Sequence, residues 1–552
     1  MFPSQLMNGA ASRLWGLMAW QSKTLTRAAA TLALLSLGAK GLGLVRDRML
    51  AATFGAGDTL DVYYAGFRIP DLLFSLFALG AISAGFLPVF TQLHEKDKDE
   101  AWRMVGNFLS LLLLVLFVAA GVLLVFAPWL VALVAPGFSG EKLERAVVVT
   151  RLLLLSPLLL GVSAVLGAIV QHSGRFLSYA LAPIMYNIGI ITGILLFSAR
   201  FAERGIVIGV LVGAVLHVAV QVPAALRSGF RFTPHVRPLY DSVKEVIRLS
   251  LPRTANLVVN QLMLTVMTAI ASTIAAGSIA VFMFAENLKA LPADMIGVSF
   301  AIAAFPALTR AALIGRENLS GLLARTLERT LFLVVPASVL IYVLRAQMVR
   351  VLYGAGAFSW EDTRLTAAAA AAFAIGIVGF SVLPILIRGF FALKDTVTPF
   401  LVAFLSAVIA VAGALGGVEL LRGQNLIAAG IKGFFKVGDL GGAEIIAVPL
   451  ALSFATAIQA ALLVIALGAA AAFPVRRIAL SFTRFLVAAA IAGGGAWLAL
   501  RFFGSSVQTD TFFKVLAHGT LGGFAGVVIY LGIAFLLRFP ELSTLLRGLR
   551  RR

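Results

Sequence analysis

Charged side chains inside apolar runs are the residues of this sequence best suited to bind a substrate. Arg46 and Asp47 interrupt one such run, and Lys289 lies in another. Placing an ionisable group at the centre of a bilayer costs about 2.5 to 3.5 kcal/mol, so such groups face a cavity or one another. Arginine donates bidentate hydrogen bonds to phosphate oxygens. We therefore expect a cationic chamber that also contains carboxylates and binds an anionic substrate. The candidate substrate-binding residues are Lys40, Arg46, Asp47, Asp61, Arg68, Asp71, Glu286 and Lys289.

The spacing of these charges indicates which of them share a helix face. Asp61 and Arg68 are seven residues apart, which places them on one stripe. Arg68 and Asp71, like Glu286 and Lys289, are three apart and can partly neutralise each other. The alternative for each charge is a helix-end side chain that reaches the lipid headgroups, and Asp61 can equally begin its helix.

Other chemistries find little support in the sequence. The chain contains no cysteine, which excludes disulfides, thiolate metal sites and a cysteine nucleophile. Its five histidines have no metal-ligand spacing. We expect no catalytic residue, no metal and no cofactor.

The composition requires a membrane environment for the whole chain. Of the 552 residues 60% are apolar and only 13% are charged, and the mean hydropathy is +0.99. Soluble proteins carry about 25% charged residues, and a helix of roughly 20 residues crosses the hydrocarbon core. We therefore predict an all-α polytopic membrane protein with about fourteen spans. They are 28–53, 61–91, 104–134, 147–171, 177–198, 205–226, 249–276, 280–309, 326–344, 365–392, 397–420, 445–472, 479–500 and 513–537.

The basic residues predict the orientation in the membrane. If the N-terminus is cytoplasmic, that side collects most of the 45 Lys and Arg residues, as the positive-inside rule requires. An even number of spans then puts both termini in the cytoplasm. The net charge of +20 is therefore attributed to loops and anionic headgroups rather than to nucleic-acid binding.

The chain contains an internal duplication. The segment 86–91 resembles 304–309, and 137–141 resembles 357–361 at nearly the same interval along the chain. Six spans separate the copies, so the two halves have the same orientation and form two pseudo-symmetric six-helix lobes. The expected parts are an N-terminal interfacial or cytoplasmic segment (1–27), an N-lobe (28–240), a C-lobe (241–475), two lipid-groove helices (476–540) and a basic cytoplasmic tail (541–552).

Several short stretches of the sequence resemble signatures of a known protein family. The stretches 43–47, 54–57 and 67–70 resemble the N-terminal signature of the MurJ (MviN) family of lipid II flippases, and 353–363 with 392–399 resemble its second signature. The resemblance covers nearly the whole chain. It implies the fold of the multidrug/oligosaccharidyl-lipid/polysaccharide (MOP) exporter superfamily, and as substrate the undecaprenyl-diphosphate-linked disaccharide pentapeptide of peptidoglycan.

The resemblance extends to individual charged positions. Arg46 and Asp47 match the Arg-Asp pair of the family's first helix, and Lys40 occupies a basic position. Arg68 matches a basic site of the second helix, and Asp61 matches its acidic start.

Two positions depart from the family pattern. Phe74 and Asn287 stand where the family has arginines. Lys289 is two residues beyond Asn287, roughly 200° around the helix, and does not replace that arginine without a change of register.

The resemblance and the charge pattern together predict a transporter. We expect alternating access through a cationic central cavity to flip lipid II from the inner to the outer leaflet of the bacterial inner membrane. The expected partners are the lipid-linked precursor and membrane lipids, with the cell-wall synthesis machinery as a further candidate, and the expected state is a monomer. Alternatives are a flippase for another lipid-linked oligosaccharide, a transport-dead scaffold, and a glycosyltransferase using Glu141, Glu361 or Asp362.

Overall fold

The computed structural model describes residues 25–79, 85–234, 241–504 and 511–544. All but the last three residues of the predicted N-terminal segment, 1–27, lie outside these ranges. The predicted basic tail, 541–552, is described only for its first four residues.

Helices account for the regular structure, and the described ranges contain no strand. Within the described ranges, eleven helices are long and apolar enough to cross a membrane. Three further predicted spans correspond to α2, to α3 with α4, and to α12, whose apolar part is the shorter stretch Leu257–Ser272. The predicted all-helical, multi-span class is therefore confirmed, with fourteen as an approximate count.

The chain forms two compact units, and the first comprises residues Met1–Thr273. In its described part α2 packs on α8, α8 on α10, and α3 on α6. Its elements are α2 (Leu25–Phe54), α3 (Asp58–Phe74), η1 (Ser75–Leu79), α4 (Leu87–Lys96), α5 (Lys98–Val134), α6 (Gly140–Leu153), α7 (Ser156–His172), α8 (Phe176–Leu196), α9 (Ser198–Phe201), α10 (Glu203–Ala219), α11 (Val222–Arg227) and α12 (Asp241–Ser272).

The second unit comprises residues Ile274–Arg552. Its main packing joins α15 to α16 and α20, α16 to α19, and α20 to α21. Its elements are α13 (Ser278–Pro292), η3 (Ala293–Val298), α14 (Ser299–Ile314), α15 (Arg316–Tyr353), α16 (Trp360–Ala392), α17 (Val397–Arg422), α18 (Leu426–Phe434), η4 (Ala443–Ile446), α19 (Ala447–Ala471), α20 (Val475–Gly504) and α21 (Phe512–Leu536).

The helix boundaries repeat along the chain as the duplication predicts. The π-helical segment η1 begins at Ser75, and its counterpart η3 begins at Ala293. The starts of α5 and α15, Lys98 and Arg316, are separated by the same interval, and α6 and α16 begin at nearly the same interval from each other. Each half thus carries a π-helical segment at the same point of its second span. Such segments are rare and occur frequently at functional sites.

The boundary between the compact units does not fall at the predicted lobe boundary. The helix α12, the seventh span, packs against η1, α3 and α5 and therefore belongs to the first compact unit. The symmetric division into lobes of six spans at residues 240 and 241 stays a prediction.

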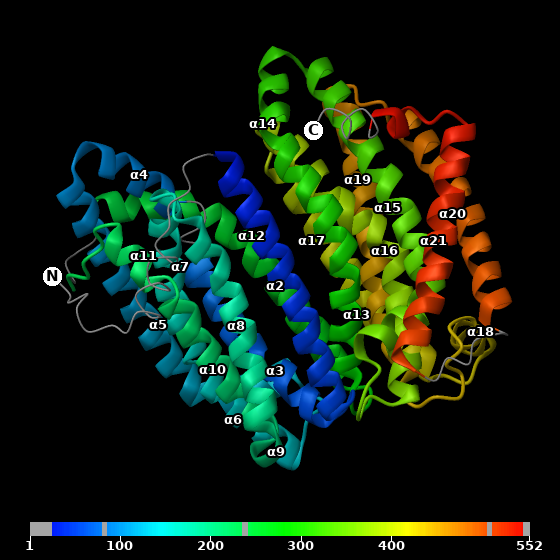
Figure 1. Cartoon of the computed structure of the whole chain (residues 1–552), viewed down its shortest axis with the longest axis horizontal. Helices are drawn as coiled ribbons and strands as arrows, with labels where there is room; N and C mark the ends of the chain where they lie inside the picture. Colours follow the sequence, from blue (N-terminus) through cyan, green and yellow to red (C-terminus); the bar gives the residue numbers. More distant parts are fainter. Residues whose placement is uncertain (1–24, 80–84, 235–240, 505–510, 545–552) are drawn as a thin grey trace. The chain divides into compact units, whose positions relative to one another are not determined.

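Glycines allow α8 and α10 to approach backbone to backbone. Gly189 and Gly193 of α8 face Gly209 and Gly213 of α10, and a Cβ at Gly193 would lie 2.4 Å from the Cα of Gly209. Small residues spaced four apart permit this close contact between membrane helices. Figure 1 shows the two helices running side by side in the first unit.

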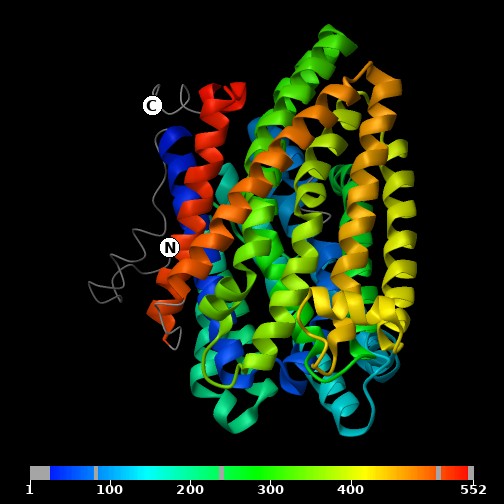
Figure 2. The ribbon, with the colours of Figure 1, turned by 90° about the vertical axis from the view of Figure 1, so that its right-hand side faces the viewer.

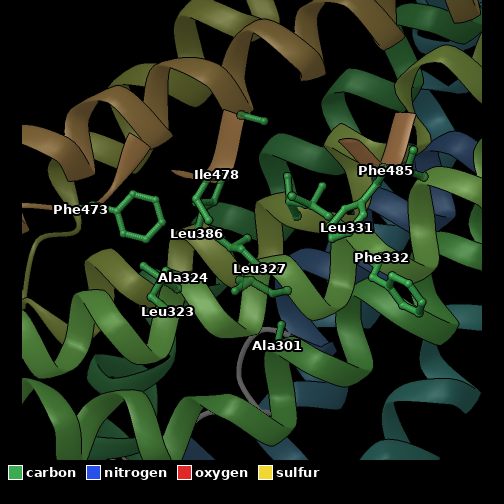
Figure 3. Packing of buried hydrophobic residues seen from close by; sticks show 14 of the residues in the cluster. Ala301, Leu323, Ala324, Leu327, Leu331, Phe332, Leu386, Phe473, Ile478 and Phe485 are labelled. Atoms are coloured by element: carbon green, nitrogen blue, oxygen red, sulfur yellow. The ribbon is translucent and has the colours of Figure 1, made fainter. Parts of the chain in front are cut away.

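Aliphatic and aromatic side chains form the core of the second unit. Leu327 and Leu331 of α15 pack with Ile478 and Phe485 of α20, and Leu386 of α16 closes the cluster (Figure 3). Since lipid is as apolar as these side chains, van der Waals packing rather than escape from water holds such helices together. This core fixes the position of α20, the thirteenth span, on the repeated helices.

Candidate functional site

A guanidinium held by two side chains lies at the centre of the first unit's polar cluster. Arg46 Nε and Nη2 donate to Asp47 Oδ1 at 2.9 and 2.7 Å, and Nη1 donates to Asn187 Oδ1 at 3.0 Å. Asp47 is buried, and Arg46 keeps a quarter of its side chain exposed. Asn187 in turn donates to the carbonyl of Pro183 at 3.0 Å. The α2–α8 contact therefore sets the direction of the Arg46 side chain.

A second group of polar residues lines α3 of the same unit. Arg68 is buried and interacts electrostatically with half-buried Asp71, in keeping with their predicted three-residue spacing. Tyr63 is also buried, and its ring packs edge-on against Tyr64 and Phe67 at 5.2 and 5.0 Å. Tyr63 interacts electrostatically with Arg46 as well as with Asp71, so the two groups share one neighbourhood.

The two remaining predicted residues of this unit lie differently. Asp61 is buried at the start of α3 and accepts a hydrogen bond from Lys142 Nζ at 3.1 Å, and Lys142 also bonds Asp58. This contact joins α6 to α3. Lys40 is exposed on α2.

A cavity of about 760 Å³ lies inside the first unit, among α2, α3, α7, α8 and α10. Its polar wall is a hydrogen-bonded trio, in which Gln221 Nε2 donates to Ser163 Oγ and Ser163 Oγ lies 2.6 Å from His217 Nδ1. Gln221 Oε1 is buried without a hydrogen-bond partner among the described residues. Phe74 contributes a neutral aromatic wall together with Tyr186. The cavity can therefore accept hydroxyl and amide groups without presenting a charge at Phe74.

Glu286 and Lys289 of the second unit form the ion pair that their three-residue spacing predicts. Lys289 Nζ donates to Glu286 Oε1 at 2.6 Å on α13. The ammonium also lies 4.1 Å from the centre of the Phe380 ring and 5.2 Å from that of Phe373, both on α16. Cation–π contacts of this kind contribute about 0.5 to 2 kcal/mol. Lys289 is thus directed toward α16, and its charge is balanced by Glu286.

An apolar cavity of about 660 Å³ opens among α15, α16, α19 and α20. Ile478 and Phe482 of α20, Leu331 of α15 and Val464 of α19 line it, and Ser338 and Tyr342 are its polar members. Of the two predicted lipid-groove helices, α20 contributes to the lining of this cavity and α21 does not. A cavity of this composition fits hydrocarbon.

The sequence prediction did not include four polar residues of the first unit. Asn187 contacts Arg46, and three others line the cavity: Ser163, His217 and Gln221. All four lie in spans that carry almost no charge, so a prediction based on charged residues did not identify them. The signal available was the four-residue spacing of His217 and Gln221 inside an apolar run, which places both on one helix face.

No group of three or more metal-ligating side chains occurs in the described part of the chain. Of the three carboxylates named as catalytic alternatives, Asp362 forms a capping box with Ser359, the N-cap residue of α16. It accepts from Ser359 N at 2.9 Å, and its own N–H donates to Ser359 Oγ at 3.0 Å.

The architecture and these clusters define a class: an integral-membrane transporter of the duplicated helical-bundle type. The model of the lipid II flippase MurJ family matches residues 50–517, and the chain belongs to that family. A probable lipid II flippase MurJ from Rhizobium tropici is 31% identical over 379 residues, which cover 66% of this chain and 70% of the relative. One from Thermotoga maritima is 29% identical over 400 residues, which cover 72% and 80%.

Solved structures show the same fold. A lipid II flippase MurJ in an inward closed conformation superposes with a TM-score of 0.71 at 23% identity, over 92% of this chain and 98% of that chain. An inward-facing multidrug resistance MATE transporter of the MOP superfamily gives a TM-score of 0.62 at 14% identity, over 81% and 98%. The predicted MOP-type fold is confirmed, and family and helices identify a multi-pass protein of the inner membrane.

Proposed function

We propose that this protein flips lipid II, the polyprenyl-diphosphate-linked precursor of peptidoglycan, from the inner to the outer leaflet by alternating access through a cationic cavity. Membership of the flippase family over residues 50–517 supports the substrate class. The single observation that carries the mechanism is the Arg46 guanidinium of α2, held by Asp47 and Asn187.

Arg46 retains hydrogen-bonding capacity for a phosphate. A guanidinium has five N–H donors, and three of them are used by the bonds to Asp47 and Asn187. Two donors, one on each Nη, remain for an oxygen of the diphosphate. Because both partners fix the plane of the group, little side-chain entropy is lost when a phosphate binds.

Two further predicted cations are each matched with a carboxylate in their own unit. Arg68 interacts with Asp71 in the first unit, and Lys289 with Glu286 in the second. Such pairs remain stable in the absence of substrate and can exchange a carboxylate for phosphate when it binds. Asp61 and Lys40 stay predictions, and we propose that Asp61 acts through Lys142 by holding α6 on α3.

The neutral parts of the headgroup are proposed to occupy the cavity of the first unit. Gln221 Oε1 needs a donor, and a sugar hydroxyl or a peptide N–H supplies one. Phe74 and Tyr186 present aromatic faces beside it.

The polyprenyl chain is proposed to lie in the apolar cavity beside α20. Burying a CH₂ group contributes about 0.8 kcal/mol relative to water, but the chain comes from lipid, so the cavity orients the tail more than it adds affinity. The tail stays in an apolar environment while the headgroup crosses.

Transport requires no covalent step under this proposal. With both termini in the cytoplasm, a negative-inside potential favours outward movement of the diphosphate by about 2.3 kcal/mol per charge per 100 mV. We propose that the protein acts as a monomer among membrane lipids and delivers its product to the cell-wall synthesis machinery.

A second candidate, a different lipid-linked oligosaccharide, is favoured by one observation. Phe74 gives the cavity a neutral wall where the family places an arginine, and Asn287 removes a second positive charge. A headgroup with fewer charges beyond the diphosphate would fit this arrangement.

The test is complementation of cells depleted of their own lipid II flippase. The wild-type chain should restore lipid II at the outer face of the membrane, and Arg46→Ala should lower transport roughly 10- to 100-fold, because a hydrogen bond to a charged group contributes about 1.5 to 3 kcal/mol. Arg46→Lys should rescue only partly. Arg103→Ala, an exposed arginine of α5, is the matched control.

Two results would contradict the proposal in different ways. A wild-type chain that fails to move lipid II but moves another lipid-linked glycan would establish the second candidate. Full transport by Arg46→Ala would refute the role of the Arg46 cluster.

A further inference from the structure

A basic pocket lies at one end of the second unit, outside every predicted site. Its volume is about 510 Å³. The ends of α15, α16, α20 and α21 meet there with the segment that follows α18, and this end of the unit is seen at the bottom of Figure 2. Its polar and aromatic lining comprises Arg345, Gln347, Trp360, Arg364, Lys436, Trp497, Arg501 and His518.

The charges in this pocket are unbalanced. Arg364 donates to both carboxylate oxygens of Asp439 and to the carbonyl of Lys436, so its charge is neutralised. Arg345, Lys436 and Arg501 have no carboxylate within 4.0 Å in the described part of the unit. Three positive charges therefore line one cavity, an arrangement that favours an anion.

Arg345 is held in place like a binding residue rather than a freely moving surface side chain. Its Nη1 donates to the carbonyl of Tyr342 at 2.7 Å, and its guanidinium lies 4.8 Å from the centre of the Tyr342 ring. The side chain is half-buried. Its remaining donors are fixed in one plane, as bidentate recognition of phosphate requires.

Gln347 adds an independent indication of a ligand. Its Oε1 is buried and makes no hydrogen bond to any described residue. A buried acceptor left unsatisfied is costly, and a hydroxyl or N–H of a ligand would satisfy it. The pocket thus presents cations for a phosphate and an acceptor for a neighbouring hydroxyl.

The surroundings place the pocket at the membrane interface. Trp360 begins α16, and Trp497 lies about two turns before the end of α20. They are 60% and 50% exposed, as tryptophans of an interfacial aromatic belt are. Phe502 follows the lining residue Arg501 in the chain, Phe513 lies in the first turn of α21, and both side chains are exposed. A lipid could place its phosphate in the pocket while its acyl chains stay against these side chains.

We propose that this pocket binds the phosphate of an anionic lipid whose headgroup carries a hydroxyl. Two lipid sources share this phosphate chemistry: a phospholipid of the bilayer, such as phosphatidylglycerol, and a polyprenyl phosphate. The proposal is independent of which lipid the protein transports.

The test measures lipid binding to the full-length protein in neutral phosphatidylcholine nanodiscs, by titration with phosphatidylglycerol or with undecaprenyl phosphate. Arg345→Gln combined with Arg501→Gln should weaken binding roughly 30-fold, as expected for the loss of two basic contacts at a membrane surface. Arg310→Gln, an exposed arginine of α14, is the control and should bind as the wild type does.

The two titrations distinguish the sources. Saturable binding of phosphatidylglycerol alone assigns the pocket to the bilayer. Binding of undecaprenyl phosphate alone assigns the phosphate site to the polyprenyl lipids and overturns the hydroxyl part of the proposal, because this lipid has no headgroup hydroxyl besides its phosphate. Equal affinity of the double variant and the wild type for both lipids would overturn the proposal.

A further variant tests the headgroup without altering any charge. Gln347→Met should reduce the preference for phosphatidylglycerol over phosphatidylmethanol, which has the phosphate but no hydroxyl. An unchanged preference would overturn the hydroxyl part of the proposal. Thermal unfolding in the absence of added lipid establishes that each variant is folded.

Discussion

Replacing Asn187 separates the position of Arg46 from its charge. The Asn187 side chain accepts from Arg46 Nη1 at 3.0 Å and donates to the carbonyls of Pro183 at 3.0 Å and Ala39 at 3.5 Å. Asn187→Leu has a similar branched shape and removes these bonds. Asn187→Asp keeps the acceptor and adds a negative charge beside the guanidinium.

The structure gives the size of the effect. A hydrogen bond to a charged group contributes about 1.5 to 3 kcal/mol, and the 3.5 Å contact to Ala39 adds little. Asn187→Leu should therefore lower the free energy of unfolding by about 1.5 to 3 kcal/mol and also weaken substrate binding, because Arg46 loses one of its two anchors. Asn187→Asp loses the donor to the Pro183 carbonyl but gains a charged acceptor for Arg46, so its free energy of unfolding should stay above that of Asn187→Leu. It should bind substrate less well than Asn187→Leu does, because its carboxylate competes with phosphate for Arg46.

The assay pairs thermal unfolding of the purified variants with a lipid II binding titration. The informative result is that Asn187→Asp is the more stable of the two variants but the weaker in binding lipid II. If Asn187→Leu matched the wild type in both, or if Asn187→Asp bound lipid II with undiminished affinity, Arg46 would not be the positioned phosphate ligand.

Three further outcomes follow from other contacts. Gly209→Ala should lower the free energy of unfolding by about 1 to 3 kcal/mol, because its Cβ would lie 2.7 Å from the backbone of α8. The control is Gly416→Ala, whose Cβ would meet no described atom within 4 Å and which should be neutral in the same thermal unfolding assay. Glu203→Gln should lower the free energy of unfolding by about 1.5 to 3 kcal/mol, because it weakens the bidentate hydrogen bonds that Arg145 donates at 2.8 and 2.7 Å. A decrease below about 0.5 kcal/mol, the range of ordinary surface substitutions, would contradict this. Burial lowers the pKa of His94 below its ordinary value of 6.5, so on acidification the unfolded chain is protonated at this residue before the folded chain is. The free energy of unfolding should therefore fall as the pH drops below about 6.5. His94→Phe should make the free energy of unfolding depend less on pH over this range.

The sequence predicted the fold through length and repetition. Apolar runs long enough to cross a bilayer can be recognised without tertiary information, and the internal repeat reappears as helix boundaries at Ser75 and Ala293. The π-helical form of those two segments could not be predicted, because it depends on local hydrogen bonding rather than on hydropathy.

The charged candidate residues could be chosen from the sequence for a different reason. An ionisable group in an apolar run is costly wherever it lies, so Arg46, Arg68 and Lys289 could be identified before their partners were known. The direction of each side chain could not. Lys289 is directed at the Phe380 ring, a contact between segments far apart in the sequence.

The neutral cavity shows the limit of a search for charge. Ser163 of α7, His217 of α10 and Gln221, which directly precedes α11, form a hydrogen-bonded trio. An uncharged polar side chain is common in membrane helices, and only the packing of α7 against α10 brings these residues together. Their joint position is a tertiary fact without a local signal.

The most direct test of the central claim is translocation of lipid II by the purified protein in sealed proteoliposomes, followed with a membrane-impermeant probe of the headgroup. The account predicts that the wild type and Arg103→Ala expose the headgroup at the same rate, and that Arg46→Ala and Asn187→Asp do so much more slowly. Equal rates for Arg46→Ala and the wild type would contradict it.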